Sequence, residues 1–202
     1  MNHNIKNLDK AAQRIKKAAQ NKERIILYGD SDLDGIASVV VLQETIKSLG
    51  GQISAVVFPD RENDGYGINL KALDFLKKLS PAVFITLDLG ISNVKEVDIA
   101  NEMGFEVIII DHHKILDELP RAKIIVNPHQ EDDTFPFKDL CTAGIAFKLC
   151  QEILSNISDG LKNSFLELVA LATIADMMPQ IDENRTFIEQ GLRSLGNTVR
   201  PG

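Results

Sequence analysis

Acidic and histidine residues gather in three short segments, each directly after an apolar run. The first is DSDLD at 30–34, the second is Asp88, and the third is DHH at 111–113. Carboxylates held ~4 Å apart repel by about 4 kcal/mol per pair at an effective dielectric of ~20, so such a group persists only where protons or cations neutralise it. Mixed carboxylate and imidazole ligands suit Mn²⁺ and similar ions. Two such ions bridged by a carboxylate can activate water and stabilise charge on a phosphoryl group.

The elements that must position these residues can be read from the apolar pattern. Helical spacing alternates with short apolar runs, which indicates an α/β fold, a parallel (Rossmann-like) sheet with helices on both faces. Ligands of open α/β sheets bind beyond the carboxyl ends of the strands. The five aspartates and two histidines should therefore meet at one sheet edge. The expected strands cover 24–28, 53–58, 83–87, 106–110 and 124–126, and the expected helices cover 8–19, 36–49, 70–79 and 93–103.

The pattern becomes helical from Cys141 onward. The stretch 165–175 is apolar nearly all round, which predicts a buried helix. Asp176 follows it and joins the candidate cluster. We expect 1–202 to form a single domain, with a sheet core at about 24–130 and a helical part at about 140–196.

Each of these acidic and histidine residues, taken alone, also fits a simpler role. An aspartate after a strand commonly caps the next helix, which is the favoured role for Asp34 or Asp88 by itself. The DxDxDG string also resembles a calcium loop, but its twelfth position, counted from Asp30, is Val41, which cannot ligate. A phosphoacceptor domain of the response-regulator kind leaves His112 and His113 without a role. The combination favours a metal centre.

Four segments resemble, in order and spacing, the signature blocks of the DHH phosphoesterases. They are GDSDLDG at 29–35, LDLGIS at 87–92, DHH at 111–113 and ATIADMMP at 172–179. Four further blocks resemble the N-terminal catalytic domain of RecJ-type single-strand exonucleases. These are FPDRENDGYGIN at 58–69, IIVNP at 124–128, CTAGIAFKL at 141–149 and DENRTFIEQGL at 182–192. The resemblance spans about 25–192.

The resemblance implies a role for each matching position. Asp88 would bridge two ions, and His113 would contact the scissile phosphate, so that Asp88, His112 and His113 form the catalytic group. Asp111 would orient a histidine. Arg61 would bind a substrate phosphate, although a surface arginine on a loop is the alternative. The metal ligands implied are Asp30, Asp32, Asp34, Asp88, His112 and Asp176.

The resemblance also implies an activity. It is the hydrolysis of single-stranded DNA, 5′ to 3′, with two divalent cations, Mn²⁺ in preference to Mg²⁺. Two alternatives stay open: a phosphodiesterase of short oligoribonucleotides or cyclic dinucleotides, and a non-catalytic scaffold. Intact acids in every block argue against the scaffold. The family's second domain is absent from these 202 residues, so we expect a truncated form rather than a naturally short protein.

Composition and charge limit the kinds of partner that this chain could bind. The net charge of −7 argues mildly against nucleic acid, although a metal cluster would absorb several acids. No apolar run could cross a bilayer, and the N-terminus lacks the apolar core of a secretory signal. Cys141 and Cys150 match no zinc spacing and are expected to be buried, reduced thiols. We therefore expect a cytoplasmic protein that binds single-stranded DNA or a short oligonucleotide and no membrane.

Overall fold

The computed structural model describes residues 4–63, 65–116 and 118–200. That part of the chain contains one five-stranded sheet of order β2-β1-β3-β4-β5, and every pairing is parallel. The predicted α/β class with a parallel sheet is thus confirmed. The strands are β1 (Ile25–Gly29), β2 (Ile53–Val57), β3 (Ala82–Leu87), β4 (Phe105–Ile110) and β5 (Ile124–Val126).

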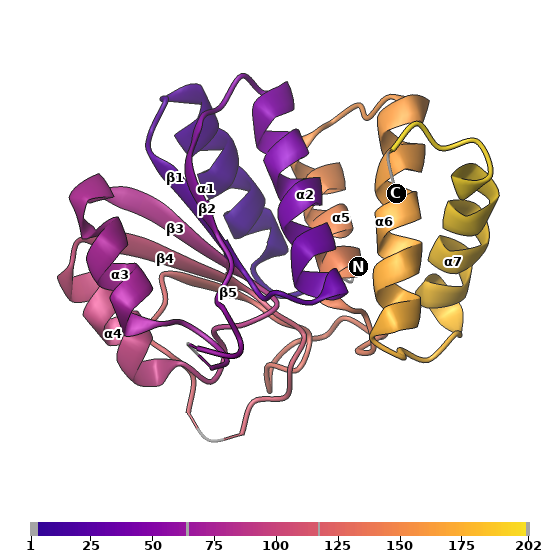
Figure 1. Cartoon of the computed structure of the whole chain (residues 1–202). Coiled ribbons are helices and arrows are strands. Elements are labelled where there is room, and N and C mark those ends of the chain that lie inside the picture. Colours follow the sequence, from indigo (N-terminus) through magenta and orange to yellow (C-terminus); the bar gives the residue numbers. More distant parts are fainter. Residues whose placement is uncertain (1–3, 64, 117, 201–202) are drawn as a thin grey trace.

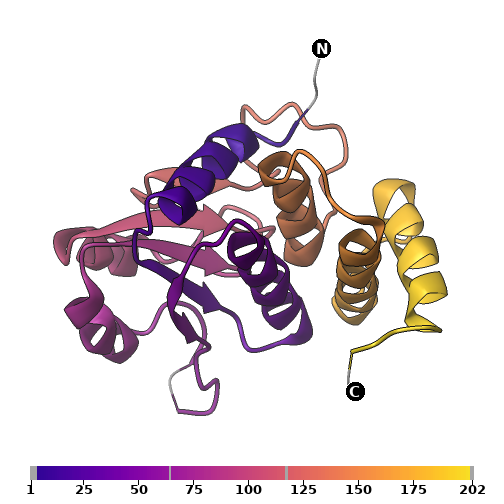
Figure 2. The same cartoon turned by 90° about the horizontal axis from the view of Figure 1, so that it is seen from above.

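Helices cover both faces of the sheet (Figure 1; Figure 2). One face packs against α1 (Leu8–Gln20), α2 (Leu33–Ser48) and α5 (Thr142–Ile153), and the other against α3 (Leu70–Leu76) and α4 (Val94–Glu102). A 3₁₀ turn, Lys77–Leu79, extends α3. The last two helices, α6 (Asp159–Ala175) and α7 (Asp182–Leu195), form a helical layer beside α2 and α5 (Figure 1). Among the described residues, no helix is both long and apolar enough to span a membrane.

The two covered faces explain why the central strands are almost entirely apolar. In β1, Ile25 and Leu27 enter the core beneath α1, α2 and α5, whereas Ile26 and Tyr28 enter the core beneath α3 and α4. Successive side chains of a strand point to opposite faces, so nearly every position of a strand with two cores is apolar, and Thr86 in β3 is a buried exception. Strand β2 differs because it lies at the sheet edge, and its residues alternate between half-buried and exposed.

Helix α6 departs from the prediction in two ways. It begins at Asp159, six residues before the expected start, because the Ser158 side chain accepts a hydrogen bond from the Leu161 amide and caps the helix. The expectation that it is buried all round is wrong for its last turn. Ile174 is 39% exposed there, because α2, α5 and α7 pack against other parts of the helix.

Candidate metal centre

Three adjacent strands deliver aspartates to one edge of the sheet. Asp30 follows β1, Asp88 follows β3 and Asp111 follows β4, and β3 lies between the other two. The parallel ladder continues one residue past each strand: the Asp30 amide donates to Leu87 O at 3.1 Å, and the Asp88 amide donates to Ile110 O at 3.0 Å. The backbone of each aspartate is therefore fixed by its neighbour strand.

The predicted ligands do lie together. Three sets of side chains each bring their ligand atoms within 4.8 Å of one another, and the sets overlap through Asp88 and His112. His112 Nε2 is 3.5 Å from Asp88 Oδ1 and 3.4 Å from Asp176 Oδ2. Asp176 reaches this group because it is the C-cap of α6. The sets are Asp30, Asp32 and Asp88; Asp88, His112 and His113; and Asp34, His112 and Asp176.

Arg61 holds the outer pair of carboxylates. Its Nη2 lies 2.8 Å from Asp30 Oδ2 and 2.9 Å from Asp32 Oδ2. Asp32 is also the N-cap of α2 and accepts the Gly35 amide at 2.9 Å. Burial disfavours its charged form, but the Gly35 amide and the Arg61 guanidinium outweigh burial and lower the pKa of Asp32 below its usual value. Asp30 and Asp32 are thus carboxylates paired with a side-chain cation.

Asp34 is held by backbone instead. Its two oxygens accept the amides of Thr142 at 2.7 Å and Ala143 at 2.8 Å, in the first turn of α5. The N-cap of α5 is Cys141, whose side chain makes no cap hydrogen bond, so Asp34 caps this helix from another element. The capping role considered for Asp34 alone is therefore real, but the helix is α5, whereas α2 is capped by Asp32. Burial raises the pKa of Asp34.

Asp88 lies at the centre of the cluster in an uncommon backbone conformation. Its φ is 65°, in the left-handed region that non-glycine residues rarely adopt. The side chain is 2% exposed, and Oδ1 accepts the Thr142 hydroxyl at 3.0 Å. Burial, followed by the nearby charges of Asp34 and Asp32, raises the pKa of Asp88 to about 11. This carboxylate requires a proton or a cation nearby at neutral pH.

Asp111 orients one histidine. It is fully buried and accepts the Ile91 amide, the His113 amide and His113 Nδ1, the last at 2.8 Å. The hydrogen bond to Asp111 raises the pKa of His113 above its usual value. His113 Nδ1 also lies 4.0 Å from Asp88 Oδ1, while the side chain is 54% exposed. The ring is thus fixed on one side and open to the cleft on the other.

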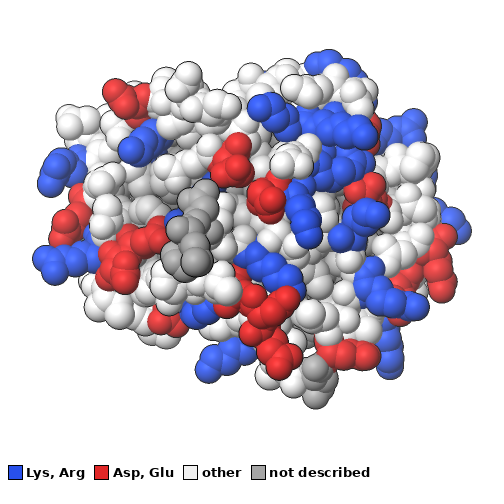
Figure 3. All heavy atoms as spheres, turned by 180° about the vertical axis from the view of Figure 1, so that it is seen from behind, with Lys and Arg blue, Asp and Glu red and all other residues white. Residues whose placement is uncertain are grey.

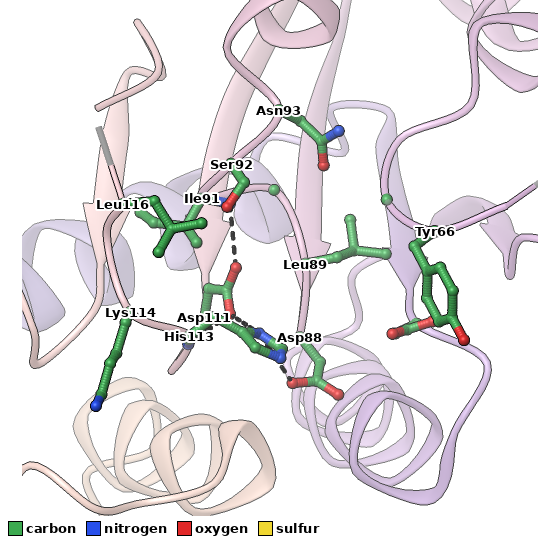
Figure 4. A pocket seen from close by; sticks show the side chains of 13 residues that line it. Tyr66, Asp88, Leu89, Ile91, Ser92, Asn93, Asp111, His113, Lys114 and Leu116 are labelled. Carbon is green, nitrogen blue, oxygen red and sulfur yellow. Dashed lines mark hydrogen bonds and ion pairs between the residues drawn. The ribbon is translucent and has the colours of Figure 1, made fainter. Parts of the chain in front are cut away.

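A cavity of about 530 Å³ opens beside Asp88 and His113. Figure 4 shows Tyr66 on one wall, Leu89 and Ile91 on the β3–α4 loop, and Leu116 on the opposite side. The metal-ligand cluster therefore borders a hollow large enough for part of a substrate.

Thr142 was not singled out by the residue pattern. Its hydroxyl holds Asp88 and its amide holds Asp34, yet threonine in the CTAG block has no chemistry of its own. The only signal was the block's resemblance to the exonucleases. Tyr66 likewise belongs to the GYG segment at 65–67, and the residue pattern gave it no role.

The comparisons with known proteins agree with this geometry. A model of the DHH family, N-terminal domain, matches residues 24–173. The single-stranded-DNA-specific exonuclease RecJ of Bacillus subtilis is 42% identical over 98% of this chain, which spans only 25% of that relative's length. That of Escherichia coli is 33% identical over 98% of the chain and 36% of its own length.

Solved structures give the same result. A crystal structure of exonuclease RecJ bound to manganese superposes with a TM-score of 0.83 at 30% identity, over 94% of this chain and 48% of that one. The family model covers most of the chain, and its signature acids lie together at the sheet edge. The chain accordingly belongs to the DHH family.

Proposed function

We propose that this chain is a catalytic core that hydrolyses phosphodiester bonds in single-stranded DNA with two divalent cations. The observation that carries the proposal is the overlap of three potential ligand sets through Asp88 and His112. Overlapping sets allow two ions to lie a few ångströms apart, as two-metal phosphoesterase chemistry requires. Relatives named single-stranded-DNA-specific exonucleases and a manganese-bound neighbour support the substrate and the metal.

The donor set fits Mn²⁺ or Mg²⁺. Carboxylates dominate it, and an imidazole adds affinity for Mn²⁺. None of the three potential ligand sets found among the described residues contains a cysteine. We propose that Asp30 and Asp32 hold one ion, that Asp34, His112 and Asp176 hold the other, and that Asp88 bridges them.

We assign each residue of the site a separate role in this hydrolysis. The bound cations supply an activated water and neutralise charge on the phosphate. Asp88 is held against both positions by Thr142, and His113, oriented by Asp111, presents its open side to the cleft for the scissile phosphate. The hydrogen bond to Asp111 raises the pKa of His113, which favours the protonated ring that can donate a charged hydrogen bond to a phosphate. Arg61 releases Asp30 or Asp32 and binds a substrate phosphate instead. The paired N–H donors of its guanidinium match two phosphate oxygens.

Charge bears on the length of the substrate. Figure 3 shows one face on which lysines and arginines gather in the upper right part, while elsewhere basic and acidic groups are interspersed. The net charge of −7 gives a long polyanionic strand little overall electrostatic attraction. It is the observation that favours the second candidate, a phosphodiesterase of very short oligonucleotides.

We further propose that the described residues form one domain, since residues of α1, β1, α5 and α6 share one apolar core. Cys141 and Cys150 are free and buried, which supports a location in the reducing cytoplasm.

The test is hydrolysis of a twenty-nucleotide single strand, labelled at either end, and of a dinucleotide, with Mn²⁺. The proposal predicts mononucleotide release from the 5′ end, lost in Asp88→Asn and retained in the matched control Asp74→Asn, an exposed acid on α3. Cleavage of the dinucleotide alone would favour the small-substrate enzyme. Absence of both hydrolysis and Mn²⁺ binding would leave the non-catalytic scaffold.

A further inference from the structure

The cavity beside Asp88 has walls that the metal chemistry does not use. Leu89 and Ile91 come from the loop after β3, and Leu116, 78% exposed, lies near Ile91 on the side away from Tyr66 (Figure 4). Tyr66 forms a further wall and is 79% exposed. Apolar side chains this exposed at the mouth of a cavity indicate a surface that a ligand covers.

The glycines around Tyr66 explain how the ring reaches this position. Gly65 and Gly67 have φ of 75° and 83°, which only glycine adopts readily. A Cβ on Gly67 would lie 2.7 Å from the Asn93 side chain, so this glycine lets the loop pack against the β3–α4 loop. Asn93 Oδ1 accepts the Ile68 amide at 3.2 Å and fastens the two loops together.

Arg61 covers part of the tyrosine ring. Its guanidinium carbon lies 5.1 Å from the ring centroid, and the same guanidinium binds Asp30 and Asp32. The ring is therefore linked directly to the ligand cluster. A flat group stacked on Tyr66 would lie next to any phosphate bound by His113 or Arg61.

Most polar side chains that line the cavity are engaged or charged, and Ser92 adds an exposed hydroxyl that can rotate. The Asn93 amide is occupied by Ile68 and Glu96, and Asp111 is occupied by Ile91 and His113. Lys114 lies at the rim, exposed, and forms no ion pair within the described ranges. None of these offers a fixed donor and acceptor pair for the edge of a particular base.

We propose that this cavity binds the nucleoside on one side of the scissile phosphate, stacked on Tyr66 and without preference among the bases. This rests on the proposed phosphodiesterase function and adds a subsite to it. Stacking recognises any base, because every base has a π face. The phosphate would lie against His113, and the Lys114 cation would lie near the following phosphate.

Binding of mononucleotides tests the subsite without requiring hydrolysis. With Mn²⁺ present, calorimetry compares the four deoxynucleoside 5′-monophosphates with 2-deoxyribose 5-phosphate, which has no base. We expect the four nucleotides to bind within about threefold of one another and at least about fivefold more tightly than the sugar phosphate. Tyr66→Ala should remove that difference, Tyr66→Phe should keep it, and Phe75→Ala, an exposed aromatic outside the cavity, should change nothing.

A spectroscopic readout locates the base. The chain has two tyrosines and no tryptophan, so fluorotyrosine NMR gives one signal for buried Tyr28 and one for Tyr66. Nucleotides should shift the Tyr66 signal and leave that of Tyr28 unchanged. Equal affinity for the sugar phosphate, an unmoved Tyr66 signal, or a preference above tenfold for one base would overturn the proposal. Hydrolysis of DNA with any of these results would leave the function intact and reject only the subsite.

Discussion

The two halves of the ligand cluster are held in opposite ways. Besides local backbone amides, Asp30 and Asp32 share one flexible partner, the Arg61 guanidinium. Among the described residues, Asp34 and Asp88 have no such partner and are held by the first turn of α5, through two backbone amides and the Thr142 hydroxyl. A guanidinium can move to another anion, but a helix terminus cannot. The cluster therefore has an exchangeable side, suited to substrate entry, and a fixed side that sets the geometry.

Removing the central charge breaks both halves and should have the largest effect. In Asp88→Asn we expect hydrolysis to fall at least about a thousandfold, which corresponds to about 4 kcal/mol. Asparagine tolerates the left-handed backbone and, unlike the buried carboxylate, needs neither a proton nor a cation to neutralise it. The metal-free variant should therefore melt above the metal-free wild type and gain little from Mn²⁺. Calorimetric melting with and without Mn²⁺ checks this, and a variant that melts lower without metal would contradict it.

The fixed side can be loosened without touching a carboxylate. Thr142→Val removes the hydroxyl that holds Asp88, and the loss of such supporting contacts costs about 10- to 100-fold in metal affinity or activity. Thr142→Ser keeps the hydroxyl and should retain most of the metal affinity and activity. The measurements are Mn²⁺ titration and the EPR spectrum of the bound manganese. Equal losses in the valine and serine variants would show that Thr142 matters only for packing.

On the exchangeable side, Arg61→Ala should weaken substrate binding but should not weaken Mn²⁺ binding. Without the guanidinium, Asp30 and Asp32 lose a competing cation, so Mn²⁺ should bind as well as before or more tightly. KM should rise about tenfold, because a charged bidentate contact to phosphate is lost. Arg121→Ala, a surface arginine paired with Asp98, is the matched control. Weaker Mn²⁺ binding in Arg61→Ala would show that this arginine organises the metal site instead.

The smallest effect is a pH dependence of stability in the metal-free protein. The pKa of Asp32 is lowered, so its contribution to stability is present above the usual value and lost as pH falls through the lower one. The pKa of Asp88 is raised to about 11, so its contribution is present below about 4 and lost as pH rises toward 11. Between pH 3 and 9, the melting temperature of Asp88→Asn should rise relative to that of the wild type as pH rises. Asp32→Asn should lose most above pH 4. A difference in melting temperature between variant and wild type that does not change with pH would refute the pKa shifts assigned to Asp32 and Asp88.

The sequence was sufficient to predict the fold class and the meeting of the acids. Strands with two cores are mostly apolar, and parallel strands put their carboxyl ends at one edge. It could not predict which partner each acid would take. Asp34 and Thr142 are 108 residues apart, and no local spacing indicates that one caps the helix of the other. The start of α6 was also missed, because its first turn is polar and only the Ser158 cap marks it.

The cap that Asp34 provides has an evolutionary consequence. If the proposed hydrolysis were lost in a descendant, Asp88 would no longer be needed, and replacing that residue would even relieve repulsion. Asp34 would still be required, because α5 has no cap of its own. Among inactive descendants of such a chain, we expect Asp34 to outlast the other acids, as a remnant of catalysis kept for the sake of a helix.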